Sequence, residues 1–154
     1  MKAIFLDVDG VLNSDKYFDK IINLNINGIE KDIDIEKIIL LKEAVNATGA
    51  IIVLCSSWRY TKKALLLKKL FLENGLVIYL TPFIQNERGL EIKKWLLDNP
   101  FVDEYVILDD EIFNSYDEEL LKKLIKISNS NGQSFGDGLM PEDVCEVIRR
   151  LGRK

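Results

Sequence analysis

The stretch KAIFLDVDGVLN at residues 2–13 decides the fold, because it joins a short apolar strand to a pair of carboxylates. Residues 2–7 are predicted to form a buried strand that delivers Asp7 and Asp9, and Gly10 follows directly. Alternate side chains of an extended chain share a face, so the two carboxylates should lie close together. Like charges at that separation repel each other unless a proton or a cation offsets the repulsion. The stretch therefore indicates an enzyme site at a strand end.

The composition narrows the chemistry that this site can use. The chain has 154 residues and 47% apolar residues, which suits one domain, residues 1–154, with a real core. It contains no histidine, so the chemistry must rely on carboxylates, hydroxyls, lysines and arginines, with or without a hard cation. The net charge of −4 gives no general attraction to nucleic acid.

The sequence shows no pattern of a membrane span, a signal peptide or a disulfide framework. No apolar run is long enough to cross a bilayer, and the N-terminus does not resemble a signal peptide. We therefore expect a soluble, cytoplasmic protein with no membrane partner. The two cysteines, Cys55 and Cys145, lie in apolar segments and are expected to be buried free thiols.

Apolar segments alternate with amphipathic ones along the rest of the chain. Further strands are predicted at 50–55, 76–80, 105–108 and 125–127, and helices at 35–48, 61–74, 89–98, 117–125 and from residue 141 onward. Because strands alternate with helices, the predicted fold is α/β, with a five-stranded parallel sheet between two layers of helices.

The segment at about 14–34 is predicted to form a small flap beside the carboxylate pair. Residues 14–20 suit a helical turn, and apolar residues then alternate on both sides of Asn27-Gly28. That dipeptide between alternating segments favours a β-hairpin, with a disordered loop as the alternative. The flap is too short to be a folded cap domain.

Polar residues follow several of the predicted strands, and in a parallel sheet those ends meet at one edge, where ligands bind. Ser56-Ser57 ends the second strand, Asp109-Asp110 ends the fourth, and Arg88 begins the helix before it. Each piece has a purely structural alternative, such as a helix cap for the serines. Their convergence on one edge favours a site.

These motifs resemble those of the haloacid-dehalogenase-like (HAD-like) phosphatase superfamily, whose fold is a Rossmann-like three-layer sandwich. The matching stretches are DVDG at 7–10, Ser56 after VLC, Arg88 as the basic third motif and LDD at 108–110. More narrowly, SSWR at 56–59, TP at 81–82, RGLEIKKWL at 88–96, YVILDDE at 105–111 and GLMPEDV at 138–144 resemble the phosphatase domain of bacterial "Swiss army knife" RNA repair proteins. The loop at 128–137 departs from that pattern.

The resemblance implies a role for each residue. Asp7 would be the nucleophile and Asp9 the proton donor and acceptor. Mg²⁺ would bind the Asp7 carboxylate, the Asp9 backbone carbonyl and Asp110, with Asp109 as a further ligand or a supporting anchor. The phosphate would be held by Ser56, Ser57, Arg88 and Gly10. The remaining candidates for substrate contacts are Asn13, Arg59 and Lys93, with Lys93 also the reserve for the basic motif. Asn13 could instead be a turn former, and Arg59 and Lys93 solvated helix residues.

The family resemblance implies that members with little or no cap act on larger substrates or on terminal phosphate groups. The expected substrates are therefore RNA or DNA ends carrying a 3′- or 5′-phosphate, or nucleotides, with a small-metabolite phosphate as the alternative. Two readings from another class are a receiver-like phospho-acceptor module and a non-catalytic relative. The order of the motifs disfavours the receiver, and four intact motif positions disfavour the non-catalytic relative.

Overall fold

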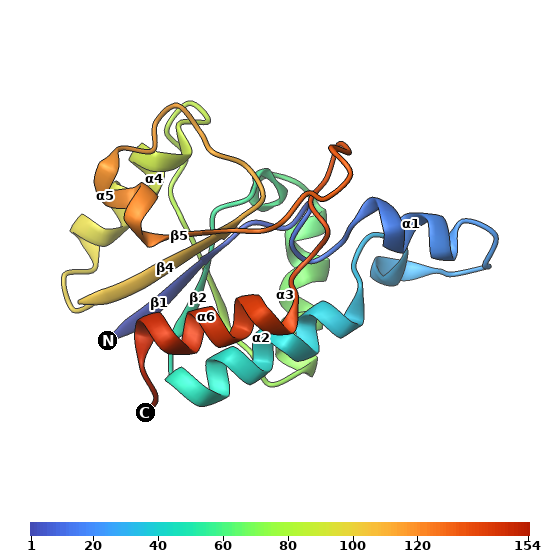
Figure 1. The fold of residues 1–154 in the computed structure, drawn as a ribbon, viewed down its shortest axis with the longest axis horizontal. Helices are drawn as coiled ribbons and strands as arrows, with labels where there is room; N and C mark the ends of the chain where they lie inside the picture. Colours follow the sequence, from blue (N-terminus) through green and yellow to red (C-terminus); the bar gives the residue numbers. More distant parts are fainter.

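The computed structural model describes residues 1–154 as an α/β fold around one five-stranded, all-parallel sheet (Figure 1). The strands are β1 (Lys2–Leu6), β2 (Ile51–Leu54), β3 (Ile78–Leu80), β4 (Glu104–Asp109) and β5 (Leu124–Lys126). The helices are α1 (Asp15–Ile21), α2 (Ile35–Thr48), α3 (Lys63–Glu73), α4 (Arg88–Asp98), α5 (Glu118–Lys123) and α6 (Pro141–Leu151), with short 3₁₀ turns η1 (Gly28–Lys31) and η2 (Ser57–Tyr60). The predicted fold class is confirmed.

The strand order β3-β2-β1-β4-β5 places β1 at the centre of the sheet. The chain leaves β1 toward β2 and β3, and then crosses back to β4 on the other side. Leu6 is in register with Leu54 of β2 and Leu108 of β4, so the three strands end together. The residues that follow β1 therefore lie at the switch point of the sheet, where ligands bind in such folds.

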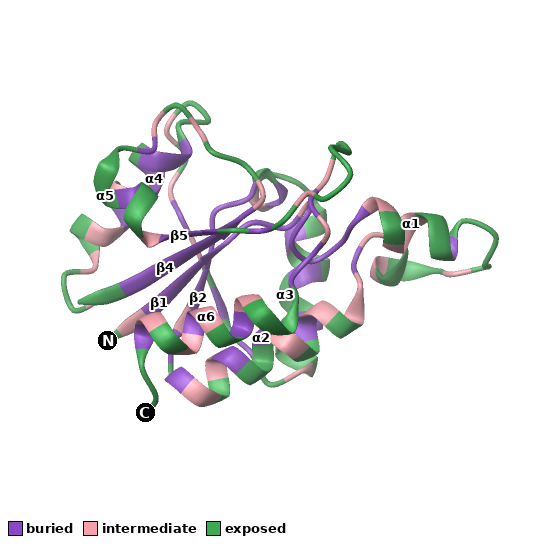
Figure 2. Cartoon of the chain, viewed as in Figure 1, coloured by how far each residue is buried: buried purple, intermediate pink, exposed green.

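Alternate residues of the strands pack into two separate hydrophobic cores, one on each face of the sheet. Ile4 and Leu6 belong to a core covered by α2, α3 and α6, whereas Ala3 and Phe5 face α4 and α5. Figure 1 shows α2 and α6 on one face of the sheet and α4 and α5 on the other. Because both faces are covered, the strands are buried along most of their length, as Figure 2 shows for β1, β2 and β4.

The insertion after β1 does not form the predicted hairpin. It contains α1 and η1 but no strand, and Ile22 and Leu24 stay exposed without a pairing partner. Asn27 has φ −112°, whereas a type I′ hairpin turn needs positive φ at both central residues. Ile33 instead returns to the main core and is fully buried, which draws the chain back to the body of the protein. The hairpin prediction was wrong, and the insertion is a small, mostly exposed flap (Figure 2).

Two other features complete the fold. Cys55 is buried as predicted, but Cys145 lies on the exposed side of α6, so the prediction of a buried thiol was wrong there. Neither cysteine forms a disulfide. No helix combines the length and the apolar character that a membrane crossing requires.

Candidate active site

A cavity of about 370 Å³ opens at the carboxyl end of the sheet. Residues from the ends of β1, β2 and β4, from the start of α4 and from the loop before α6 line it. They are Asp7, Asp9, Cys55, Ser56, Ser57, Arg59, Tyr60, Asn86, Arg88, Glu91, Asp110, Glu111, Phe113 and Phe135. The structure thus brings together most of the residues that the sequence analysis proposed.

Arg88 links the two central carboxylates at the floor of this cavity. Its Nη1 lies 3.1 Å from Asp7 Oδ1 and 2.7 Å from Asp109 Oδ2, and all three side chains are largely buried. The guanidinium also lies over the Phe113 ring, 4.2 Å from its centroid. A buried, permanently charged arginine between carboxylates suits the basic position of the site.

Asp7, Asp109 and Asp110 form a carboxylate cluster whose ligand atoms lie within 4.8 Å of one another. Burial raises the pKa of Asp7 to about 7, although Arg88 lowers it. Burial also raises the pKa of Asp110. Three carboxylates next to one guanidinium leave two negative charges without a partner. The protein must therefore bind a proton or a cation there.

Asp109 belongs to the cluster and is also held by three hydrogen bonds. Oδ2 accepts hydrogen bonds from Arg88 and from the Tyr116 hydroxyl at 3.0 Å, and Oδ1 accepts the backbone N–H of Glu111 at 3.0 Å. Burial raises the pKa of Tyr116, so its O–H stays a donor. Asp110 differs: its Oδ2 accepts one backbone N–H, from Gly136 at 2.7 Å, and it lines the cavity.

Asp9 is held by two donors that orient its carboxylate. The Asn13 Nδ2 donates to Oδ1 at 2.9 Å and the Trp58 Nε1 donates to Oδ2 at 3.2 Å. Asn13 is 1% exposed and does not line the cavity, and its bond to Asp9 orients that carboxylate. Sequence reasoning did not assign this role to Trp58. A buried indole N–H needs a hydrogen-bond acceptor, and this rule could have predicted that Trp58 bonds a nearby carboxylate.

The serines after β2 divide their roles. Ser56 is buried and its Oγ accepts the backbone N–H of Trp58 at 3.3 Å, so it caps η2 as well as lining the cavity. Ser57 is exposed at the cavity wall. Between them and the strand lies Cys55, and burial raises the pKa of its thiol, which disfavours a thiolate nucleophile here.

Gly10 does not line the cavity, so its predicted contact with phosphate is not supported. Its φ is +81°, and a Cβ there would lie 2.0 Å from Asp110 Oδ2 and 2.6 Å from the Gly136 backbone nitrogen. The glycine therefore lets the Asp110 carboxylate and the loop before α6 approach the turn after β1.

This contact makes Gly10→Ala informative. We expect the variant to lower the melting temperature and to weaken Asp110-dependent cation binding, because the strain of a positive φ, about 1–3 kcal/mol, is joined by a steric clash. The matched control is Gly132→Ala, whose φ is +60° but whose Cβ would meet nothing within 4 Å. Thermal unfolding of both variants, with and without Mg²⁺, measures the difference. Equal melting temperatures for the two variants would contradict the assignment.

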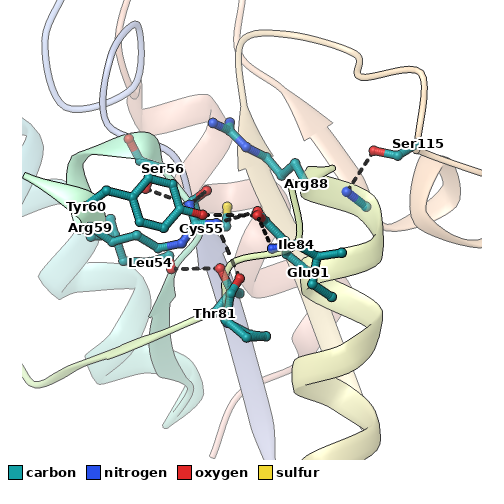
Figure 3. Close-up of polar contacts among 12 residues, drawn as sticks. Leu54, Cys55, Ser56, Arg59, Tyr60, Thr81, Ile84, Arg88, Glu91 and Ser115 are labelled. Atoms are coloured by element: carbon teal, nitrogen blue, oxygen red, sulfur yellow. Dashed lines mark hydrogen bonds and ion pairs between the residues drawn. The ribbon is translucent and has the colours of Figure 1, made fainter. Parts of the chain in front are cut away.

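Arg59 lines the cavity, but its guanidinium is held in a buried ion pair. Arg59 and Glu91 side chains are only 3% and 2% exposed, and the Arg59 Nη2 pairs with Glu91 Oε2. Nη1 donates to the backbone oxygens of Cys55 at 2.6 Å and Ser56 at 2.7 Å. Figure 3 shows this pair bridging the end of β2 and α4. The pair ties the serine loop to the helix that carries Arg88.

Glu91 accepts two further hydrogen bonds beside its ion pair with Arg59. Its Oε1 accepts hydrogen bonds from the Tyr60 hydroxyl at 3.0 Å and from the Ile84 backbone N–H at 2.9 Å (Figure 3). The start of α4 is fixed in addition by the Gly89 N–H, which donates to Ser115 Oγ at 2.9 Å. Sequence reasoning treated this helix start only as the carrier of Arg88.

Lys93 lies outside the cavity, on the exposed side of α4, where it pairs with Asp117. The expectation that it contacts the substrate or fills the basic motif is therefore not supported. Arg88 occupies that position instead, next to Asp7.

Comparison with known families agrees with this geometry. The family model described as "HAD domain in Swiss Army Knife RNA repair proteins" matches residues 3–134. The chain belongs to this family. No curated protein and no solved structure gives a significant match. The family is part of a superfamily of phosphatase-type hydrolases, and the matched range contains every carboxylate and the arginine of the cluster.

Proposed function

We propose that the chain is a Mg²⁺-dependent phosphatase that works through an aspartyl-phosphate and acts on the terminal phosphates of RNA or DNA, or on nucleotides. The observation that carries this proposal is the position of Asp7. It lies at the switch point of the sheet, in ion-pair contact with Arg88 and clustered with Asp110, at the floor of an open cavity.

Asp7 acts as the nucleophile in this proposal. One of its oxygens attacks phosphorus, the bond from phosphorus to the leaving oxygen breaks, and an aspartyl-phosphate forms. Asp9 gives its proton to the leaving oxygen. Asp9 then takes a proton from the water that attacks phosphorus, which releases inorganic phosphate and restores both carboxyl groups. The N–H groups of Asn13 and Trp58 keep the Asp9 oxygens in place throughout.

The residues present fit a hard divalent cation. The cluster has two negative charges in excess, and all its donors are oxygens, which Mg²⁺ prefers. The carboxylates of Asp7 and Asp110 would hold the ion, joined by the backbone carbonyl of Asp9, as in the family resemblance, while Asp109 supports them from behind. When bound, Mg²⁺ neutralises charge on the transferring phosphoryl group.

The phosphate group has its own partners in this proposal. Arg88 supplies a guanidinium at the cavity floor, and the hydroxyls of Ser56 and Ser57 lie on the wall after β2. Charge-assisted hydrogen bonds from arginine to phosphate are about twice as strong as neutral ones. The phosphate would thus be held by Arg88 and the two serine hydroxyls, next to Asp7.

The open cavity and the small flap support a terminal phosphate on a large molecule. The insertion between β1 and α2 contains only α1 and η1, so no folded cap closes over the site. The family description, which names RNA repair proteins, points to nucleic acid. Without a folded cap, a small metabolite bound in this cavity would stay open to water, which disfavours the small-metabolite alternative.

Phosphate release from a panel of substrates tests the proposal. We expect the purified protein to hydrolyse an aryl phosphate with Mg²⁺ and to lose this activity in EDTA. We also expect 3′- or 5′-phosphorylated oligonucleotides, or mononucleotides, to be better substrates than sugar phosphates. Turnover of sugar phosphates alone would overturn the nucleic-acid part. Absence of any turnover with Mg²⁺ would leave a non-catalytic relative.

A further inference from the structure

We propose that Phe135 is a stacking platform for the base of the terminal nucleotide. This inference rests on the proposed function and deepens it, because it assigns the outer part of the cavity to a nucleobase. The residue belongs to the loop between β5 and α6 that sequence reasoning left without a role.

The cavity has a charged floor and an aromatic rim. The side chains at the floor, among them Asp7, Ser56 and Arg88, are buried and suit a phosphate and a cation. The three aromatic residues of the lining, Tyr60, Phe113 and Phe135, are exposed or half-buried. A phosphate needs no aromatic surface, whereas unpaired nucleobases bind by stacking on such rings.

Among these rings, Phe135 is the one without a cation on it. Arg88 lies 4.2 Å from the centroid of Phe113, and Arg59 lies 4.2 Å from that of Tyr60. Tyr60 also has an edge contact with Phe83, at 5.0 Å between ring centroids. The ring of Phe135 is half-buried and pairs with the ring of Phe18, at 6.0 Å between centroids and an angle of 61°. Unlike the rings of Tyr60 and Phe113, the ring of Phe135 therefore carries no guanidinium that a base would have to displace.

The backbone holds Phe135 close to the reacting centre. Its neighbour Gly136 donates its N–H to Asp110 Oδ2 at 2.7 Å, and the N–H of Phe135 itself lies 3.3 Å from Asp15 Oδ2 of α1. Phe135 is thus next in sequence to a residue that hydrogen-bonds a carboxylate of the cluster, and it lines the same cavity as Asp7 and Asp110. In a nucleotide one ribose separates the base from a terminal phosphate. A phosphate at Asp7 would therefore leave its base within reach of this ring.

Further backbone hydrogen bonds hold the loop that carries Phe135 in place before a substrate binds. The loop is tied to the turn after β1, since Gly138 donates to the Gly10 carbonyl at 3.1 Å and Leu139 donates to the Val11 carbonyl at 2.7 Å. A ring that is already fixed costs little conformational entropy when a base binds. Stacking of one base on an aromatic side chain changes affinity by about 5- to 150-fold on substitution by alanine.

The test compares two substrates that differ only in the terminal base. One is an oligonucleotide with a phosphate on its last residue, and the other is the same strand with an abasic last residue. For Phe135→Ala we expect kcat/KM on the base-bearing strand to fall at least about 5-fold, and kcat/KM on the abasic strand to change less than about 2-fold. Phe135→Trp should keep the preference for the base. Glycerol phosphate serves as the small substrate, because an aryl phosphate carries a ring that could itself stack.

The matched control is Phe101→Ala, which removes an aromatic side chain that is 53% exposed and lies outside the cavity. It should behave as the wild type on all three substrates. Equal losses on the base-bearing and abasic strands, or no loss at all, would overturn the stacking role. If the wild-type protein releases phosphate from none of these substrates, the proposed phosphatase function fails instead, so the two failures are distinguishable.

Discussion

Asp7→Asn should reduce phosphatase activity by about 10⁴-fold or more, the scale on which removal of a nucleophile acts in other enzymes. The amide cannot form the acyl phosphate, and it also removes one charged ligand of the proposed cation. The measurement is kcat on an aryl phosphate in saturating Mg²⁺. An Asp98→Asn variant, altered at an exposed residue of α4, is the matched control and should keep full activity. Turnover of Asp7→Asn within tenfold of the wild type would refute the nucleophile assignment.

Asp7→Asn should be at least as stable as the wild type, so its loss of activity would not come from unfolding. Burial raises the pKa of Asp7 from 3.8 to about 7, so the folded protein binds this proton more tightly than the unfolded chain does. Stability from this group is therefore fully present below about pH 4 and is lost as the pH rises through about 7. Asp7→Asn removes a cost of roughly 1–4 kcal/mol in the metal-free protein at pH 8.

Thermal unfolding in EDTA between pH 4 and pH 8 checks this sign. The wild-type melting temperature should fall across that window relative to Asp7→Asn, by about 2–4 °C for each kcal/mol. Addition of Mg²⁺ should restore the wild type and have little effect on the variant, since a ligand that binds only the folded state stabilises it. A variant less stable than the wild type at pH 8 without Mg²⁺ would show that Asp7 mainly supports the fold.

The parts of the fold that sequence could predict are those governed by local apolar pattern and by topology. Asp7, Ser56 and Asp110 each follow an apolar strand, and parallel strands in register bring such ends to one edge. Helix ends at positions such as Gly49, with φ +72° at the C-cap of α2, were predictable for the same local reason.

The rest depended on contacts between residues far apart in sequence. Nothing local indicates that Arg59 pairs with Glu91 across 32 residues, or that Phe135 reaches the site from a loop 125 residues after Gly10. The hairpin failed because burial of Ile33 in the main core outweighed the turn preference of Asn27-Gly28. Local propensity is a weak prior where tertiary packing decides.

Three networks of hydrogen bonds and ion pairs surround the cavity, and each holds a different residue of the candidate site in place. Asp109 and Tyr116 hold Arg88, which faces Asp7. Asn13 and Trp58 hold Asp9. The third network, between Arg59 and Glu91, contacts no reacting atom but fixes the loop that carries Ser56. It is the one whose removal should cost the most stability.

Glu91→Ala should destabilise the protein by about 3–5 kcal/mol, because it leaves the buried Arg59 guanidinium without a counter-charge. The Tyr60 hydroxyl and the Ile84 N–H lose their acceptor as well, and the Arg59 Nε is already a buried donor without a partner. The melting temperature should fall by roughly 6–20 °C. The matched control is Asp98→Ala, which breaks an exposed ion pair on the same helix and should cost at most about 1 kcal/mol.

A double variant, Arg59→Met with Glu91→Leu, separates the stability of this pair from its effect on the site. Apolar side chains of similar volume often replace a buried ion pair without loss of stability, so most of the melting temperature should return. The carbonyls of Cys55 and Ser56 nevertheless lose their donor, and the serine loop loses its link to α4. Inhibition by inorganic phosphate should therefore stay weakened by about tenfold, since a lost hydrogen bond to a charged group costs about 1.5–3 kcal/mol. Full recovery of both properties would mean that the ion pair serves the fold alone, whereas recovery of stability without phosphate affinity would show that it positions the loop.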